Sequence, residues 1–99
     1  RYIIDAGSKC LGLDKGAHNI SLVKGFGIIK GHPELLMEAL SEEVGKIQSI
    51  GSTTVKVGDI LEIIPNHACV AANMTNYLMG CRHGEVERRL YIDARGGLQ

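Results

Sequence analysis

Two side chains that bind metals lie two positions apart in the segment Pro65-Asn66-His67-Ala68-Cys69. On an extended segment, residues i and i+2 point to the same face with Cα atoms roughly 6.5–7 Å apart. The imidazole of His67 and the thiolate of Cys69 could then reach one ion. Nitrogen and sulfur are donors that zinc prefers. We therefore consider His67 and Cys69 as ligands of Zn²⁺ or of another divalent metal such as Mn²⁺.

Two protein ligands do not complete a tetrahedron. Structural zinc usually has four protein ligands, whereas catalytic zinc keeps a position open for water or substrate. A site built on His67 and Cys69 would therefore be catalytic. The spacing alone favours a plainer interpretation, in which His67 is a loop histidine and Cys69 a small buried hydrophobic residue.

The other histidines and cysteines are weaker candidates. His18 lies in a polar turn and His83 at an expected hairpin tip, so solvated loop roles are predicted for both. His32 could face the same cavity as His67. Two further cysteines are expected to pack as small hydrophobic side chains, namely Cys10 and Cys81.

The segment Asp5-Ala6-Gly7-Ser8-Lys9 places a carboxylate, a hydroxyl and an amine around a glycine. It could hold a phosphate or a carboxylate, or it could be an ordinary turn. Lys9 is rejected as a Schiff-base lysine, because that role needs a desolvated amine facing a cofactor pocket. No catalytic residue is predicted within residues 1–99.

The secondary structure that must position these residues is predicted to be mostly β. Thirteen glycines spread along 99 residues indicate many short elements joined by turns within one domain, residues 1–99. Runs rich in strand-forming residues are each bounded by Gly, Asn, Asp or Pro. These runs are residues 2–4, 20–23, 26–30, 53–57, 59–64 and 87–93.

Turn residues give the expected connections. Lys56-Val57-Gly58-Asp59 predicts a tight turn leading into a strand, and Pro65 marks the edge or end of that strand. Arg82-His83-Gly84-Glu85 predicts a hairpin tip. Residues 33–43 have helix propensity, but a strand through residues 37–41, a turn at 42–45 and a return strand at 46–50 is an equal alternative.

The composition excludes several classes of protein. Eleven basic and eleven acidic residues give a formal net charge of zero, which argues against nucleic acid or an anionic membrane as partner. No apolar run approaches the roughly 18 residues of a membrane helix. Three irregularly spaced cysteines favour a reducing compartment, so a cytoplasmic protein is expected. Because Arg1 is not Met, we expect the chain to be cut from a longer one.

An ordered series of motifs along nearly the whole chain resembles the C-terminal domain of the D-serine dehydratase and D-threonine aldolase family. The motifs are Asp5-Ala6-Gly7-Ser8-Lys9, Asp14-Lys15-Gly16-Ala17-His18, Gly25-Phe26-Gly27 to Gly31-His32-Pro33, Leu40-Ser41-Glu42-Glu43, Lys56-Val57-Gly58-Asp59, Ile63-Ile64-Pro65-Asn66-His67-Ala68-Cys69 and Asp93-Ala94-Arg95-Gly96. This resemblance shifts the balance of the two interpretations of His67 and Cys69 toward a metal site.

The resemblance implies a pyridoxal-phosphate enzyme related to alanine racemase. Its (β/α)8 barrel would carry the cofactor lysine and is absent from these residues, and its C-terminal domain would be a small β-barrel-like domain with few or short helices. In that family the positions of His67 and Cys69 bind the metal. The expected enzyme is a homodimeric lyase of β-hydroxy D-amino acids, and this chain alone is expected to be inactive.

Two details bear on the reaction within that family. The resemblance implies that the zinc-dependent dehydratases have Cys at the position of Cys69, whereas the aldolases often have Asp there. The residues alone do not decide between the two reactions. Val44 departs from the family pattern, which has His after Ser-Glu-Glu, and Val can neither donate nor accept a proton. The alternative from another class is a non-catalytic β-barrel module that binds a ligand or a protein without a pyridoxal-phosphate partner.

Overall fold

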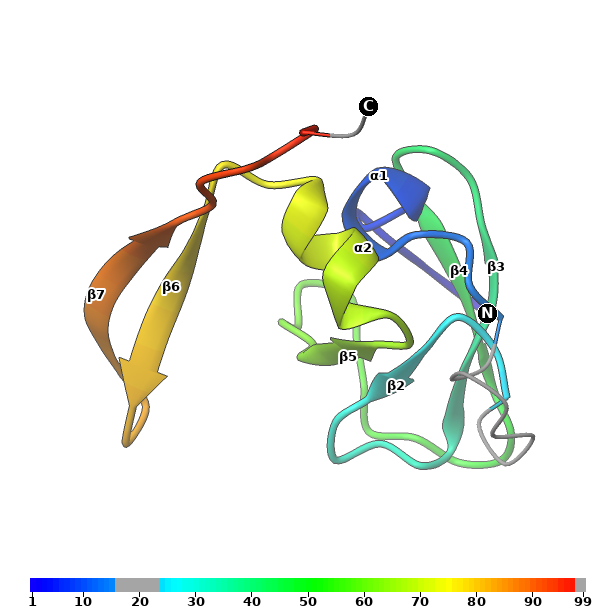
Figure 1. Cartoon of the computed structure of the whole chain (residues 1–99). Coiled ribbons are helices and arrows are strands. Elements are labelled where there is room, and N and C mark those ends of the chain that lie inside the picture. Colours follow the sequence, from blue (N-terminus) through cyan, green and yellow to red (C-terminus); the bar gives the residue numbers. More distant parts are fainter. Residues whose placement is uncertain (16–23, 98–99) are drawn as a thin grey trace.

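The protein is mostly β, as the sequence predicts, and the residues that the structure describes contain two short helices. Figure 1 shows the computed structural model, which describes residues 1–15 and 24–97. The elements in chain order are β1 (Tyr2–Ile4), α1 (Ser8–Leu11), β2 (Gly27–Ile29), β3 (Leu35–Leu40), β4 (Gly45–Ser49), β5 (Ile63–Pro65), α2 (Ala68–Asn73), β6 (Tyr77–Arg82) and β7 (Glu85–Tyr91).

The largest sheet has three antiparallel strands in the order β1-β4-β3. Ile47 of the central strand β4 lies opposite Tyr2 of β1 and opposite Met37 of β3, and both Ile47 and Met37 are completely buried. Residues 33–43 therefore contain a strand and not a helix. Leu35 and Met37 alternate with less buried neighbours along β3, and burying that one face outweighs the local helix propensity.

A second, two-stranded sheet pairs β2 with β5 and completes the small core. Ile29 of β2 is buried beside Leu35 and Met37, and Leu11 at the end of α1 closes the same cluster. Pro65 ends β5 opposite Gly27, as expected for a residue that cannot donate a ladder hydrogen bond. The core brings the loop after α1 and the chain after β5 to one side of the molecule (Figure 1).

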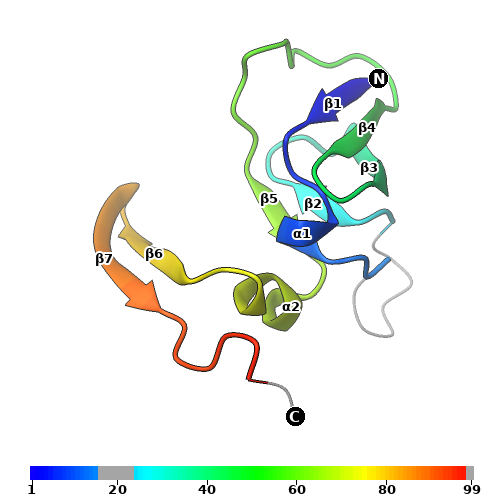
Figure 2. The ribbon, with the colours of Figure 1, turned by 90° about the horizontal axis from the view of Figure 1, so that it is seen from above.

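The third sheet is a hairpin of β6 and β7 that stands away from the rest of the chain (Figures 1 and 2). His83 and Gly84 form its tip with φ angles of 51° and 78°. A two-residue loop with positive φ at both positions matches the right-handed twist of the strands. The hairpin predicted at residues 82–85 is therefore confirmed.

Closure into a barrel is a prediction that the structure corrects. In the part of the chain that the structure describes, the strands form separate sheets of three, two and two strands. Within residues 1–15 and 24–97, the hairpin strands pair only with each other, so these sheets are not closed into a barrel. Nor does any helix of residues 1–15 and 24–97 reach the length and apolarity needed to cross a membrane.

Two of the predicted strands are also corrected. Residues 53–57 form no ladder, and the Val55 amide donates instead to the Thr53 hydroxyl at 3.3 Å, which itself donates to Glu34 at 2.8 Å. The run 59–64 becomes a strand only from Ile63. The turn before it is confirmed, since the Lys56 amide donates to the Asp59 carboxylate at 3.0 Å. The strand predicted at residues 20–23 lies outside the described residues.

Candidate metal centre

His67 lies where β5 gives way to α2. It caps the first turn of α2 with extended backbone angles, φ −134° and ψ 96°, and Cys69 is the second residue of the helix. The segment is therefore not extended through Cys69, and the predicted same-face geometry does not hold. Three alanines, Ala68, Ala71 and Ala72, favour helix here and are the sequence signal for it.

Asp14 pairs with His67. Its carboxylate pairs with Nδ1 of the His67 ring, across 53 positions in the sequence. A carboxylate beside Nδ1 can accept a hydrogen bond from that ring nitrogen. Metal-binding histidines usually have such a carboxylate or a carbonyl behind the ring, where it fixes the tautomer and raises the basicity of the ligand nitrogen.

Asn66 holds Asp14 in place. Its side-chain amide donates to the backbone carbonyl of Asp14 at 2.7 Å and to that of Gly25 at 2.9 Å. One side chain thereby ties together the chain before residue 16 and the chain after residue 23. Asn66 was not predicted as a site residue, although its place beside His67 made it a candidate for this positioning role.

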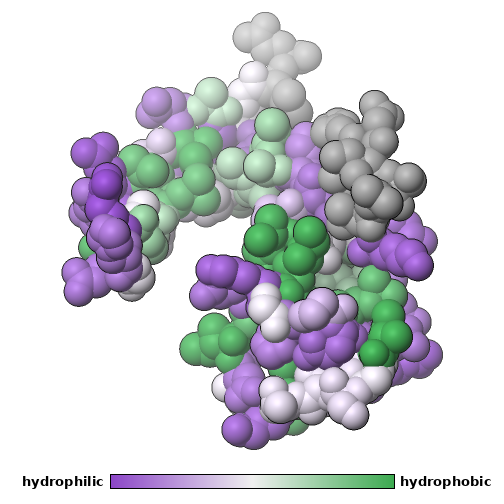
Figure 3. All heavy atoms as spheres, turned by 90° about the horizontal axis from the view of Figure 1, so that it is seen from below, coloured by the Kyte–Doolittle hydropathy of each residue, from purple (hydrophilic) through white to green (hydrophobic). Residues whose placement is uncertain are grey.

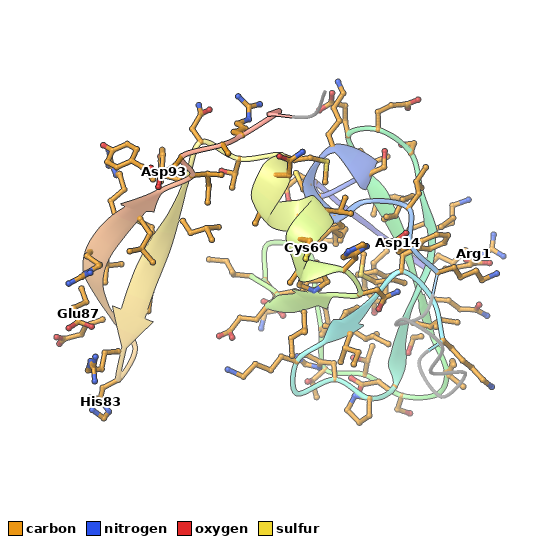
Figure 4. All side chains as sticks on the ribbon, viewed as in Figure 1. Arg1, Asp14, Cys69, His83, Glu87 and Asp93 are labelled. Atoms are coloured by element: carbon orange, nitrogen blue, oxygen red, sulfur yellow. The ribbon has the colours of Figure 1, made fainter. Side chains whose placement is uncertain are left out.

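Cys69 is a free thiol on the surface, near the start of α2, as Figure 4 shows together with Asp14. The interpretation of Cys69 as a buried hydrophobic residue is therefore wrong. The same correction applies to Cys10 and Cys81, which are also free and exposed. The short helices and the projecting hairpin leave too little apolar cover to bury them.

The donors at the start of α2 fit zinc in chemical type. They are an imidazole with a carboxylate behind it and an exposed thiol. Among residues 1–15 and 24–97, no group of three or more His, Cys, Asp and Glu side chains is arranged to hold a metal. A metal bound by His67 and Cys69 would therefore need further ligands from water, substrate or another part of the protein.

His32 belongs to a different cluster from His67. Its Nδ1 atom lies 3.0 Å from the Glu34 carboxylate, which also accepts the Thr53 hydroxyl. Hydrogen bonds lower the pKa of Glu34 from its ordinary value. The largest effect comes from the backbone amide of Glu34 itself, and smaller ones come from the side chains of Thr53 and His32. Of the remaining histidines, His83 sits at the exposed hairpin tip as predicted, and His18 lies outside the described residues.

The segment from Asp5 to Lys9 does not form an open anion site. The amides of Ser8 and Lys9, which could have bound a phosphate, donate to the carbonyls of Ser41 and Glu42 at 2.8 and 3.2 Å. Lys9 also pairs with Glu43, and the hydrogen bond and charge of Glu43 raise the pKa of the Lys9 amine. These contacts dock α1 on the turn between β3 and β4.

Comparison with known proteins identifies the family. The sequence model of the family described as "Putative serine dehydratase domain" matches residues 1–81. The chain belongs to this family. The match covers β1 through most of β6, including Asp14, His67 and Cys69, so the candidate metal centre lies within the family domain.

The curated relatives are of two kinds. D-serine dehydratase of Dictyostelium discoideum is 36% identical over 80 residues, and 3-hydroxy-D-aspartate aldolase of Paracoccus denitrificans is 27% identical over 94 residues. This chain spans 20% and 22% of those two proteins. An uncharacterised protein of Mycobacterium tuberculosis is 32% identical over 97 residues, which are 97% of this chain and 70% of that protein.

Proposed function

We propose that this chain is the metal-binding C-terminal domain of a pyridoxal-phosphate-dependent lyase that acts on β-hydroxy D-amino acids. The observation that carries the proposal is the pairing of His67 with the Asp14 carboxylate, at a position that resembles the metal ligand of the family. The similarity to a D-serine dehydratase and to a hydroxyaspartate aldolase supports the substrate class.

In this proposal His67 and Cys69 hold the ion, and their neighbours orient His67. Asp14 pairs with Nδ1 of His67 and so orients the ring, and Asn66 fixes the backbone of Asp14. Zinc, or another divalent metal such as Mn²⁺, would supply Lewis acidity toward the β-hydroxyl of the substrate. Because these two residues leave coordination positions open, they suit an ion that also contacts substrate and not a closed structural site.

The rest of the enzyme lies beyond these residues. A chain that spans about a fifth of the two lyases leaves room for the (β/α)8 barrel that would carry pyridoxal phosphate on a lysine. The barrel and a second subunit are the proposed partners, in a cytoplasmic homodimer. Val44 lies in the turn on which α1 docks and is 42% exposed, so its difference from the family's His would alter a surface beside α1.

Metal analysis of the purified chain tests the proposal. After incubation with zinc and gel filtration, we expect about one zinc ion per chain, and its loss in His67→Ala and in Cys69→Ala. His83→Ala is the matched control, since this histidine lies at the distant hairpin tip (Figure 4). Full zinc occupancy in both ligand variants would refute the assignment.

The M. tuberculosis relative favours a second candidate function. Because this chain covers 70% of that protein, the relative has no room for a barrel of about 250 residues. The second candidate is therefore a small non-catalytic module that binds a ligand or another protein. Adding a family barrel domain to this chain separates the two, because restored lyase activity on D-serine supports the enzyme, and no activity with a zinc-loaded complex supports the module.

A further inference from the structure

A pocket of about 280 Å³ lies apart from the candidate metal centre, beside β2 and the start of β3. Its lining includes two basic and four large apolar residues, namely Lys24, Ile28, His32, Leu35, Leu36 and Ile50. None of the residues of the candidate metal centre lines it. Seen from below, the side on which the β2–β3 connection lies in Figure 1, the surface has apolar patches beside hydrophilic ones (Figure 3). The pocket therefore offers a ligand both apolar walls and polar groups.

His32 is held firmly at the edge of this pocket. Its backbone amide donates to the Ile29 carbonyl, and its own carbonyl accepts the Leu35 amide, both at 3.1 Å. On the ring, Nδ1 lies 3.0 Å from the Glu34 carboxylate, which also accepts the Thr53 hydroxyl at 2.8 Å. His32 lines the pocket, whereas Glu34 does not. The carboxylate therefore steadies the ring from outside the pocket, and Nε2 is the ring nitrogen left to contact a ligand.

The polar groups of the pocket suit an anion. In a protonated imidazole both nitrogens donate, so His32 can bind Glu34 through Nδ1 and a ligand oxygen through Nε2 at the same time. Lys24 adds an exposed ammonium group, which no ion pair ties to a carboxylate of residues 1–15 and 24–97. A ligand carboxylate has two oxygens and can accept charge-assisted hydrogen bonds from both residues.

The remaining walls are apolar and determine the kind of anion. Leu35 is buried, whereas Ile28 and Ile50 are 46% and 65% exposed, so an alkyl group that covers these two residues would remove apolar surface from water. A pocket of about 280 Å³ has room for about nine non-hydrogen atoms, at the roughly 30 Å³ that one water molecule occupies. This is the size of a short branched acid and not of a nucleotide.

We propose that this pocket binds a small aliphatic carboxylate of about six to nine non-hydrogen atoms. The carboxylate lies between Lys24 and His32, and the alkyl chain lies against Leu35, Leu36 and Ile50. The proposal depends neither on zinc nor on lyase activity, because the pocket shares no lining residue with the candidate metal centre. A polar substrate such as D-serine lacks the alkyl chain that the apolar walls favour, so the proposed ligand is a different molecule from the proposed substrate.

NMR titration of the isotope-labelled chain with isocaproate, a short branched acid, tests the proposal. We expect saturable shifts of the backbone amides of Ile28, His32, Leu36 and Ile50, with a dissociation constant of about 0.1–1 mM. Isocaproamide has the same shape without the charge and should bind at least about tenfold more weakly. Equal binding of the acid and the amide would overturn the proposal, and so would the absence of saturable shifts at about 10 mM acid.

Two variants assign the polar contacts. Lys24→Gln removes the exposed charge and should weaken isocaproate binding about fivefold, and His32→Leu removes both ring nitrogens and should weaken it about tenfold. Lys46→Gln is the matched control and should bind as the wild type does, because Lys46 is an exposed lysine of β4 outside the pocket. Lys24 lies on the surface, so its replacement tests the site even if His32→Leu destabilises the fold. Wild-type affinity in either folded variant, or shifts confined to the β6–β7 hairpin, would contradict the proposal.

Discussion

Replacing Asp14 tests whether the carboxylate behind His67 tunes a metal ligand. Asp14→Asn keeps an oxygen that can accept the Nδ1 proton but removes the negative charge. Asp14→Ala removes both the charge and the acceptor. Comparing the two variants therefore separates the effect of the charge on the basicity of His67 from the effect of the hydrogen bond on its orientation.

The size of the effect follows from the exposure of the pair. Removing a residue that orients a metal ligand typically costs 10–100-fold in metal affinity, or about 1.4–2.7 kcal/mol. The side chains of His67 and Asp14 are 25% and 48% exposed, so water screens part of the charge. We therefore expect Asp14→Asn to weaken zinc binding by about tenfold, and Asp14→Ala by up to about a hundredfold.

Competition with a chromophoric zinc chelator measures both affinities. Asp59→Asn is the matched control, because it removes the same charge from an exposed turn, where the carboxylate accepts a hydrogen bond from the nearby Lys56 amide. Zinc binding should be unchanged in Asp59→Asn. If Asp14→Ala binds zinc as tightly as the wild type, while His67→Ala does not bind it, the proposed role of Asp14 is wrong.

Three further predictions concern the frame around the site. Ile47→Ala removes a completely buried side chain between β1 and β3, and it should lower the free energy of unfolding by about 2–5 kcal/mol in urea titrations. Because the pKa of Glu34 is lowered in the folded chain, its carboxylate stabilises the fold at pH values above the ordinary pKa of 4.5. This stabilisation should disappear as the pH falls through the lower pKa of the folded state. Glu34→Gln should therefore show a smaller loss of stability between pH 6 and 3 when urea midpoints are compared, at about half-unit pH steps. Gly7→Ala places a Cβ in steric clash with the backbone carbonyl oxygens of Ser41 and Glu42, so it should detach α1 and lower the thermal midpoint measured by calorimetry.

The local signals that the sequence carries are those that need no distant partner. His83-Gly84 at the hairpin tip and Gly58 in the turn before Asp59 are positions where the backbone adopts positive φ, and both turns could be located from residue type. Pro65 marked the end of a strand for the same local reason. The family resemblance, carried by motifs along the whole chain, likewise followed from the order of residues.

Tertiary contacts decided what those signals left open. Residues 35–40 became a strand because Leu35 and Met37 bury one face in the core, which outweighs their helix propensity. The choice between an extended and a helical course for Cys69 depended on three alanines and on how α2 packs. Asp14, which pairs with His67, lies 53 positions away, so no local pattern could show this contact.

The sequence by itself determined the residue types available for chemistry, the positions of the tight turns and the family to which the chain belongs. Only the tertiary structure decided that Asp14 stands behind His67, that Asn66 holds it there, and that the hairpin projects with both faces exposed. The physical reason is that turn geometry depends on neighbouring residues, whereas an ion pair or an apolar surface depends on which distant segments the core brings together.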